Sequence, residues 1–404
     1  MKQKPPIDDK LIEFRFPTVK ETVLKNGLTV MVIEQPKIPK VYYRVGIQVG
    51  EKHDPPGKEG TMDLLSLLIK KGTQRRSYEE IVEQVDFMGG ELDAVSRRDF
   101  FYLFGEFLQE YAAQGLEIVA DVLMNPVFPP EELEKEKAKM LADLENEKSS
   151  PAFLANRKFN EVLFQPHPYA RYKTPESLQA IERQTIQEMH ERYIRPNNSY
   201  LVIAGAVTFE TAVQLAREYL EGWEQKPLPT DTAPEPQPPK HRTVFLIDRP
   251  DSEQSNILLG NVLFNRKHPD YEKAVVMNKI LGGGASGRLF MYLREEKGYT
   301  YGAYSSIRTY KDHGAFSANA EVRTEVTREA TDGFFEQFRA LREAPVSEED
   351  LKNAKRYLIG VFPLQNETPS SIASLAMQQK LYDLPDDYWN QYLKAIDAVT
   401  REDV

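Results

Sequence analysis

The chain contains 404 residues, enough for two or more domains, and its hydrophobic content of 41% and charged content of 28% are ordinary for a globular protein. The net charge of −10 argues against binding to nucleic acid, which requires clustered lysine and arginine. Because there is no cysteine, disulfides, thiolate zinc sites and a cysteine nucleophile are all excluded.

The sequence leaves the cellular compartment open. No apolar run reaches the length of a membrane span, so no membrane-spanning segment is expected. The first ten residues, MKQKPPIDDK, have no apolar h-region, and we therefore expect no signal peptide in this chain.

The first half of the chain predicts a mixture of strands and helices. The segment GTMDLLSLLIKKGT (residues 60–73) predicts a helix that is apolar on nearly every side, with Asp63, Ser66 and Lys70 on one face because they are three and four positions apart. Next, GGELDAVSRRDFFYLFGEFL predicts two strands. EYAAQGLEIVADVLM and PPEELEKEKAKMLADLENEK then predict two helices, NSYLVIAGAV a strand, and TFETAVQLAREYLEGW a helix.

Residues 224–240, EQKPLPTDTAPEPQPPK, predict a proline-rich linker that divides the chain into residues 1–223 and 241–404. The two parts resemble copies of one unit, because Leu133 corresponds to Leu351 and Pro151 to Pro369, both 218 positions apart. In each copy two strands precede a series of helices. This order predicts an α+β unit with a mostly antiparallel sheet and helices on one face.

The last strand and helix of the first part have no counterpart in the second. The chain stops at TREDV, where the matching helix would begin. We expect either that the second copy is truncated at its C-terminus or that its sheet lacks a strand, and we favour truncation.

The segment LGGGASGRLF contains a G-x-G-x-x-G pattern at Gly282, Gly284 and Gly287. Dinucleotide binding requires a strand directly before this pattern, whereas YEKAVVMNKI has a helical period. The pattern therefore predicts a helix-to-helix loop at which two chain segments approach closely.

The segment LREEKGYTYGAYSS places Arg294 near a helix end, Gly298 as the residue that ends the helix, and Tyr301 in a following strand. A guanidinium and a phenol in one space can hold a peptide carbonyl or an oxyanion. Taken by residue type alone, the pair is more simply a helix-capping arginine and a strand tyrosine, and both interpretations stay open at this point.

The histidines do not form a helical metal motif, because no two of them are four positions apart. A proline-framed turn, QPHPYARY, favours a structural role for His167. A zinc site built from scattered histidines is a weaker alternative. The six histidines are His53, His167, His190, His241, His268 and His313.

These segments together resemble the M16 zinc peptidases, the family of pitrilysin, insulin-degrading enzyme and mitochondrial processing peptidase. The resemblance covers essentially the whole chain and rests on TVLKNGLTVMVIEQ, KKGTQRRS, HPY, NSYLVIAG and LREEKGYTYGAYSS, in that order. It implies two homologous α+β domains of the M16/LuxS-like metallohydrolase fold. It is compatible with the bacterial cytoplasm or periplasm.

Family members that cut peptides carry H-x-x-E-H on a helix that ends in a K-G-T-like turn. Aligned on this turn, the two histidine positions hold Asp63 and Leu67, and the glutamate position holds Ser66. The position of the third ligand, a glutamate farther along, holds Asp143. Leu67 cannot bind a metal and Ser66 cannot take a proton from a zinc-bound water, so the resemblance implies no zinc and no proteolysis by this chain alone.

A second signature of the family is retained. M16 peptidases complete their site with an arginine and a tyrosine seven positions apart, as Arg294 and Tyr301 are here. By residue type alone a structural role for the two residues was preferred, and the resemblance reverses this in favour of a functional pair. The family also binds substrate as an added strand, which implies substrate pairing along Asp93, Ala94, Val95 and Ser96. The glycine-rich loop of its non-catalytic mitochondrial subunit implies a role in substrate entry for Gly282, Gly283 and Gly284.

The sequence therefore favours a non-catalytic subunit that joins a homologous subunit with an intact H-x-x-E-H motif, encloses unfolded peptides, and supplies Arg294 and Tyr301 in trans. Zinc is expected only in the partner, and a homodimer is conceivable in isolation. The first alternative is a purely structural or peptide-binding homologue with no role in proteolysis, like the core subunits of respiratory complexes that share this fold. The second is a stand-alone metalloenzyme, which would require stoichiometric zinc.

Overall fold

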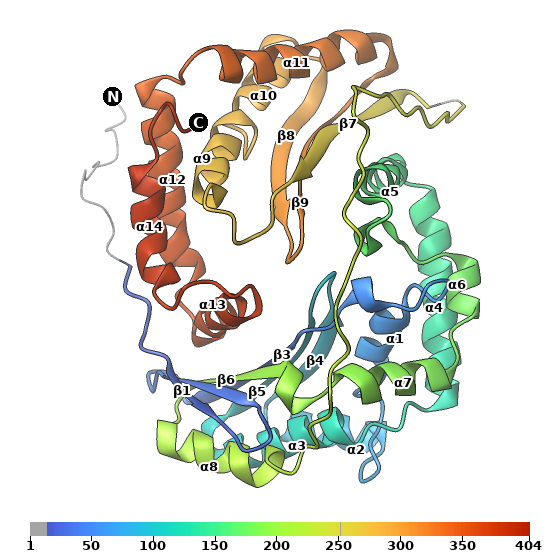
Figure 1. Cartoon of the computed structure of the whole chain (residues 1–404), viewed down its shortest axis with the longest axis vertical. Coiled ribbons are helices and arrows are strands. Elements are labelled where there is room, and N and C mark those ends of the chain that lie inside the picture. The colour runs from blue at the N-terminus through green and yellow to red at the C-terminus, as the bar shows by residue number, and fades with distance from the viewer. Residues whose placement is uncertain (1–13, 251) are drawn as a thin grey trace.

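The computed structural model describes residues 14–250 and 252–404, so the segment MKQKPPIDDK lies outside the described residues. Each half of the chain contributes one sheet (Figure 1). The six-stranded sheet of the first half has the order β1-β2-β6-β3-β5-β4, and the three-stranded sheet of the second half has the order β7-β9-β8. All neighbouring strands are antiparallel except β2 and β6, which confirms the predicted α+β class with mostly antiparallel sheets.

The elements follow the predicted order in both halves. The strands are β1 (Lys20–Val23), β2 (Thr29–Glu34), β3 (Lys40–Ile47), β4 (Glu91–Ser96), β5 (Phe101–Leu108), β6 (Ser199–Gly205), β7 (Gln254–Leu263), β8 (Thr300–Thr309) and β9 (Gly314–Arg323). The helices of the first half are α1 (Thr61–Leu68), α2 (Tyr78–Phe87), α3 (Ala112–Met124), α4 (Pro130–Lys148), α5 (Pro151–Phe164), α6 (Pro175–Gln179), α7 (Arg183–Tyr193) and α8 (Phe209–Leu220).

The second half contains α9 (Tyr271–Leu281), α10 (Arg288–Phe290), α11 (Thr327–Glu343), α12 (Glu348–Gln365), α13 (Pro369–Leu381) and α14 (Tyr388–Ala398). A π-helix, η5 (Met291–Glu296), continues α10. Single-turn 3₁₀ helices are η1 (Glu51–His53), η2 (Gln109–Tyr111), η3 (Pro168–Ala170), η4 (Pro196–Asn198) and η6 (Thr324–Val326). The described residues between α8 and β7, which include the predicted linker, form no helix or strand.

Local sequence signals explain where several elements begin and end. Proline at the first helical position starts both α5 and α13, and the hydroxyls of Ser150 and Thr368 cap these helices. This confirms the predicted correspondence of the two prolines. The Asn-Gly pair before β2 forms the hairpin turn, with Gly27 at φ +85°. Helix α1 is shorter than the predicted stretch, because regular helix stops at Leu68.

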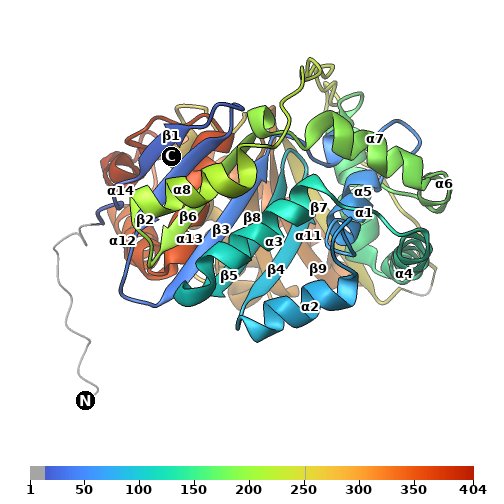
Figure 2. The same ribbon diagram turned by 90° about the horizontal axis from the view of Figure 1, so that it is seen from below.

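One helix from each half packs on the sheet of the other half. Helix α13 of the second half packs on β3 and β6 of the first sheet, where Met377 and Ile372 share a core with Val202 and Met31. Helix α5 of the first half packs on β7, and Phe159 and Val262 pack against the same hydrophobic cluster. Both helices lie between the two sheets (Figure 1). The opposite face of the first sheet is covered by α3 and α8, which Figure 2 shows from below.

Candidate functional site

The polar face of α1 is held by contacts within the first half. Asp63 forms an ion pair with Lys173, with Oδ2 and Nζ 2.9 Å apart. The Ser66 hydroxyl is buried and donates to the carbonyl of Asp63 at 2.7 Å. Leu67 packs against the main core of the first half. All three degenerate motif positions therefore have partners that do not involve a metal.

Lys173 places a cation beside the first position of the degenerate motif. Burial alone would lower the pKa of Lys173, but the carboxylates of Asp63, Glu147 and Glu51 outweigh it and raise the pKa. Asp143, the predicted position of the third ligand, is exposed on α4. Within residues 14–250 and 252–404, no group of three or more His, Asp or Glu side chains is arranged to hold a metal ion.

The beginning of α1 depends on a buried carboxyl that the sequence did not single out. Asp54 accepts hydrogen bonds from the backbone N–H groups of Gly60 (2.7 Å) and Met62 (2.8 Å). Burial raises the pKa of Asp54 to about 8, although both hydrogen bonds act in the other direction. The side chain fixes the entry to the helix that carries the degenerate motif.

Strand β4 forms an edge of the first sheet, because it pairs with β5 and with no other strand of the described chain. Its predicted substrate-pairing positions alternate, with Ala94 and Ser96 buried, Asp93 exposed and Val95 between these extremes. Asp93 forms an ion pair with Lys70, which lies in the turn after α1. This edge carries the unpaired backbone groups that an added strand needs.

Arg294 and Tyr301 lie on either side of an irregular helix-to-strand turn. Arg294 lies in the π-helix η5, which closes with the Lys297 N–H donating to the carbonyl of Tyr292 at 3.0 Å. Gly298 then adopts the left-handed conformation, with φ +63°, as the sequence predicted. π-Helical turns are frequently found at functional sites, and periodicity alone could not reveal this one.

A β-bulge follows directly. The register of β8 against β9 shifts between Thr300 and Ala303, and the Thr300 hydroxyl donates to the carbonyl of Glu321 at 2.6 Å. Tyr301 lies in this bulge and its side chain is 88% exposed. The Arg294 guanidinium stacks on the Phe290 ring at 4.8 Å and is partly exposed. Bulges re-aim side chains, and this one presents a phenol close in sequence to a guanidinium.

The glycine-rich loop connects α9 to α10, which confirms the predicted helix-to-helix loop and excludes a dinucleotide fingerprint. The backbone N–H of Ser305 on β8 donates to the Gly282 carbonyl at 3.0 Å. A Cβ at Gly282 would lie 2.5 Å from the Ser305 nitrogen. Glycine at this position therefore lets the loop lie directly on the strand that carries Tyr301.

A buried polar junction joins the halves and was not predicted. The Lys52 ammonium lies 2.7 Å from Asp231 of the linker, 2.8 Å from Asp312 and 3.7 Å from Asp99. Burial would lower the pKa of Lys52, but hydrogen bonds to Asp231 and Asp312 outweigh it and raise the pKa. His167 is buried beside Asp312 and accepts from the N–H of Tyr169, in line with its predicted structural role.

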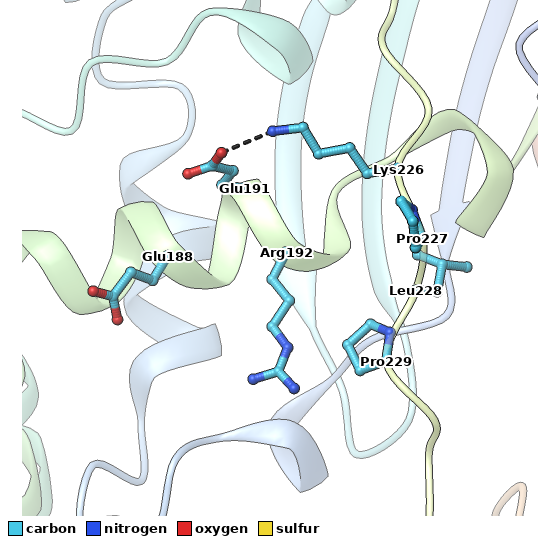
Figure 3. A pocket seen from close by; sticks show the side chains of 7 residues that line it. All are labelled: Glu188, Glu191, Arg192, Lys226, Pro227, Leu228 and Pro229. Atoms are coloured by element: carbon cyan, nitrogen blue, oxygen red, sulfur yellow. Dashed lines mark hydrogen bonds and ion pairs between the residues drawn. The ribbon is translucent and has the colours of Figure 1, made fainter.

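A shallow cavity of about 480 Å³ lies between α7 and the start of the linker. Figure 3 shows its lining, in which Glu191 and Lys226 form an ion pair at 2.8 Å. The lining residues are Glu188, Glu191, Arg192, Lys226, Pro227, Leu228 and Pro229. None of the residues predicted to be functional lines this cavity. In the part of the chain that the structure describes, no helix is long and apolar enough to span a membrane.

Solved structures share the whole architecture. A peptidase M16 inactive domain from Pseudomonas fluorescens superposes with a TM-score of 0.87 at 24% identity, over 95% of this chain and 93% of that one. A protease from Helicobacter pylori superposes with a TM-score of 0.88 at 21% identity, over 96% and 95%. The fold is therefore the two-domain M16 fold, as the resemblance implied.

Sequence comparison gives the family. Residues 29–173 match the model described as "Insulinase (Peptidase family M16)", and residues 180–358 match "Peptidase M16 inactive domain". Zinc protease YmxG of Bacillus subtilis, described as uncharacterized, is 23% identical over 388 residues, 96% of this chain and 94% of that protein. An uncharacterized zinc protease of Rickettsia bellii is 28% identical over 74% of this chain and 72% of its own length. The chain belongs to peptidase family M16.

Proposed function

We propose that the chain is the non-catalytic subunit of a two-chain M16 peptidase. In this proposal it joins a homologue with an intact H-x-x-E-H motif, encloses unfolded peptides, and supplies Arg294 and Tyr301 to the partner's site. The observation that carries the proposal is that Arg294 lies in a π-helix and Tyr301 in the β-bulge that follows it. Backbone irregularities of both kinds are frequent at functional sites, and here they carry a guanidinium and an exposed phenol that are seven positions apart in sequence.

The chemistry assigned to each chain follows from the side chains present. This chain offers Asp63, Ser66 and Leu67 where a catalytic subunit has its metal ligands and base, and Lys173 already neutralises Asp63. A guanidinium and a phenol together donate hydrogen bonds to a substrate carbonyl or to the oxyanion that forms from it. The free edge of β4 and the loop at Gly282 are the surfaces along which we propose that peptide binds.

The test is an activity assay on the complex of this chain with its zinc-bearing homologue. Arg294→Ala combined with Tyr301→Phe is expected to lower peptide cleavage by roughly 10²-fold or more, the scale of losing oxyanion donors. Arg192→Ala, on the distant α7 surface, is the control and should leave cleavage unchanged. If the double variant cleaves as fast as the original complex, the rival interpretation of a structural or peptide-binding homologue is correct instead.

A further inference from the structure

The described part of the chain buries two lysines, and they differ in their partners. The Lys52 ammonium is surrounded by three carboxylates at the junction of the halves. Lys279, near the C-terminal end of α9, is only 9% exposed and forms no ion pair with a described residue. Its Nζ donates to the Gly283 carbonyl at 3.2 Å and lies 3.5 Å from the centre of the Tyr357 ring. A buried ammonium without a counter-ion is costly, because neutral partners replace only part of its hydration.

The electrostatics of the glycine-rich loop, residues 282–287, differ at its two ends. Burial lowers the pKa of Lys279 before the loop, and no described carboxylate acts in the other direction. The next cation along the chain, Arg288, follows the loop directly and forms an ion pair with Asp350 of α12 at 3.1 Å. The loop therefore lies between one cation that has a counter-ion and one that does not.

The loop itself offers donors and space to an anion. The backbone N–H groups of Gly284, Ala285 and Ser286 are bonded to no other group of the described chain. Gly284 has φ +153°, a conformation that favours glycine, and a Cβ there would lie 3.0 Å from the Lys279 Nζ. Glycine therefore leaves this side of the ammonium uncovered. Successive free N–H groups are an arrangement that binds anions.

Two buried polar atoms beside the same loop have no hydrogen-bond partner among the described residues. One is Oγ of Ser305, a residue that is 6% exposed, and it would lie 2.7 Å from a Cβ on Gly282. The other is Oδ1 of Asn278, whose side chain lies against Gly283 with Nδ2 3.3 Å from the Cβ position. Because buried polar groups are nearly always bonded, orphaned ones at one loop indicate that a ligand or a water binds there.

We propose that Lys279 and the glycine-rich loop bind the C-terminal carboxylate of a peptide. The carboxylate takes the place of the Gly283 carbonyl on the Lys279 ammonium and accepts from the free N–H groups of the loop. The terminal residue also has a backbone N–H beside its carboxylate, which matches the unpaired Oδ1 of Asn278. The proposal rests on the peptide binding in the proposed function, and it names the end of the peptide that this chain holds.

The test measures binding to the full chain alone, so that neither a partner nor cleavage is involved. Two fluorescein-labelled peptides of roughly ten alanine, glycine and serine residues are compared by fluorescence anisotropy. One ends in a free carboxylate and the other in a carboxamide. The free carboxylate is expected to bind at least roughly tenfold more tightly, the scale of a charge-assisted hydrogen bond. Inorganic phosphate and a carboxamide peptide with an internal glutamate are the competitors, and both should displace it poorly.

Protein variants assign the effect to the loop. Lys279→Gln keeps a donor for the Gly283 carbonyl but removes the charge, so it should weaken binding of the free carboxylate by roughly tenfold and leave the carboxamide peptide unaffected. Gly284→Ala should also weaken it, because the new Cβ covers the ammonium. Lys273→Gln, on the same helix, removes an exposed charge and is the matched control. Urea unfolding of Lys279→Gln should show no loss of stability, because the charge that it removes has no counter-ion.

The outcomes separate this proposal from the proposed function. Equal binding of the two peptides, or stronger binding of phosphate or of the glutamate peptide, overturns the proposal and leaves the proposed function standing. A preference for the free carboxylate that Lys279→Gln retains also overturns it. If neither peptide binds, both this proposal and the peptide binding in the proposed function are wrong.

Discussion

At the scale of single residues, two carboxyls and their partners determine the chemistry available on α1. Buried Asp54 accepts two backbone hydrogen bonds from the start of the helix, and Lys173 forms an ion pair with Asp63 in its first turn. The Asp63 carboxylate pairs with Lys173 outside the helix, and the Ser66 hydroxyl donates to the backbone carbonyl of Asp63. Two predictions follow from these contacts, one about the pH dependence of stability and one about zinc content.

The first prediction concerns pH. The pKa of Asp54 is about 8 in the folded protein, compared with 3.8 for an aspartate in the unfolded chain. The folded state therefore binds this proton more tightly than the unfolded state does. Its stabilising contribution is complete below pH 3.8 and is lost as the pH rises through about 8. The original chain should therefore lose up to about 1.4 kcal/mol of unfolding free energy per pH unit in this window, relative to Asp54→Asn.

The measurement is urea unfolding of both proteins from about pH 5 to about pH 9. Asp54→Asn keeps a carbonyl for one of the two N–H donors, so it is expected to fold but to be less stable at the acid end by about 1 kcal/mol. The two stability curves should therefore cross within about one pH unit of the acid end, and Asp54→Asn should be the more stable protein at the alkaline end. Curves that run parallel would show that Asp54 does not titrate in this range.

The second prediction concerns zinc. Asp63 is bonded to Lys173, and neither Ser66 nor Leu67 offers a strong zinc ligand. After equilibration with zinc and removal of the excess, the purified chain should contain far less than one zinc per chain, as measured by elemental analysis. Stoichiometric zinc that is lost in Asp63→Ala but retained in Arg192→Ala would contradict this expectation.

At the scale of elements, sequence and structure agree where the signal is local. The prolines at 151 and 369, the Asn-Gly turn and Gly298 each act within a few residues, and each feature is where the pattern predicts it. The π-helix η5 and the bulge in β8 could not be predicted, because a one-residue irregularity leaves the apolar pattern nearly unchanged. The pairing of Asp63 with Lys173 depends on segments 110 positions apart and is equally invisible to pattern.

The glycine loop gives a prediction at this scale. Gly282→Ala should lower the unfolding free energy by about 1–3 kcal/mol, because the new Cβ would lie 2.5 Å from the backbone nitrogen of Ser305. Gly360→Ala is the matched control. Gly360 lies within α12 with open space around its Cβ position, so alanine should raise stability by about 0.5–1 kcal/mol. Thermal unfolding of both variants checks the opposite signs, and equal effects would contradict the packing argument.

At the scale of the whole molecule, three connections tie the halves together. Helix α13 completes the core on one face of the first sheet, and α5 covers β7 of the second. The Lys52 junction adds a buried charge cluster that includes the linker through Asp231 and the β8–β9 turn through Asp312. Each half has a main core built from its own residues, and the two smaller cores beneath α13 and α5 contain residues of both halves.

The chain should therefore unfold in one cooperative transition. Its two tryptophans test this directly, because Trp223 belongs to the core of the first half and Trp389 donates to the Leu375 carbonyl of α13 in the second. Trp223→Phe and Trp389→Phe each leave one fluorescent reporter. Both should give the same midpoint as circular dichroism measured on the same variant.

Met377→Ala, which removes a side chain that α13 buries on the first sheet, should lower the unfolding free energy by about 2–5 kcal/mol and shift both reporters together. If only the Trp389 signal moves, α13 belongs to the second half alone and the halves unfold independently.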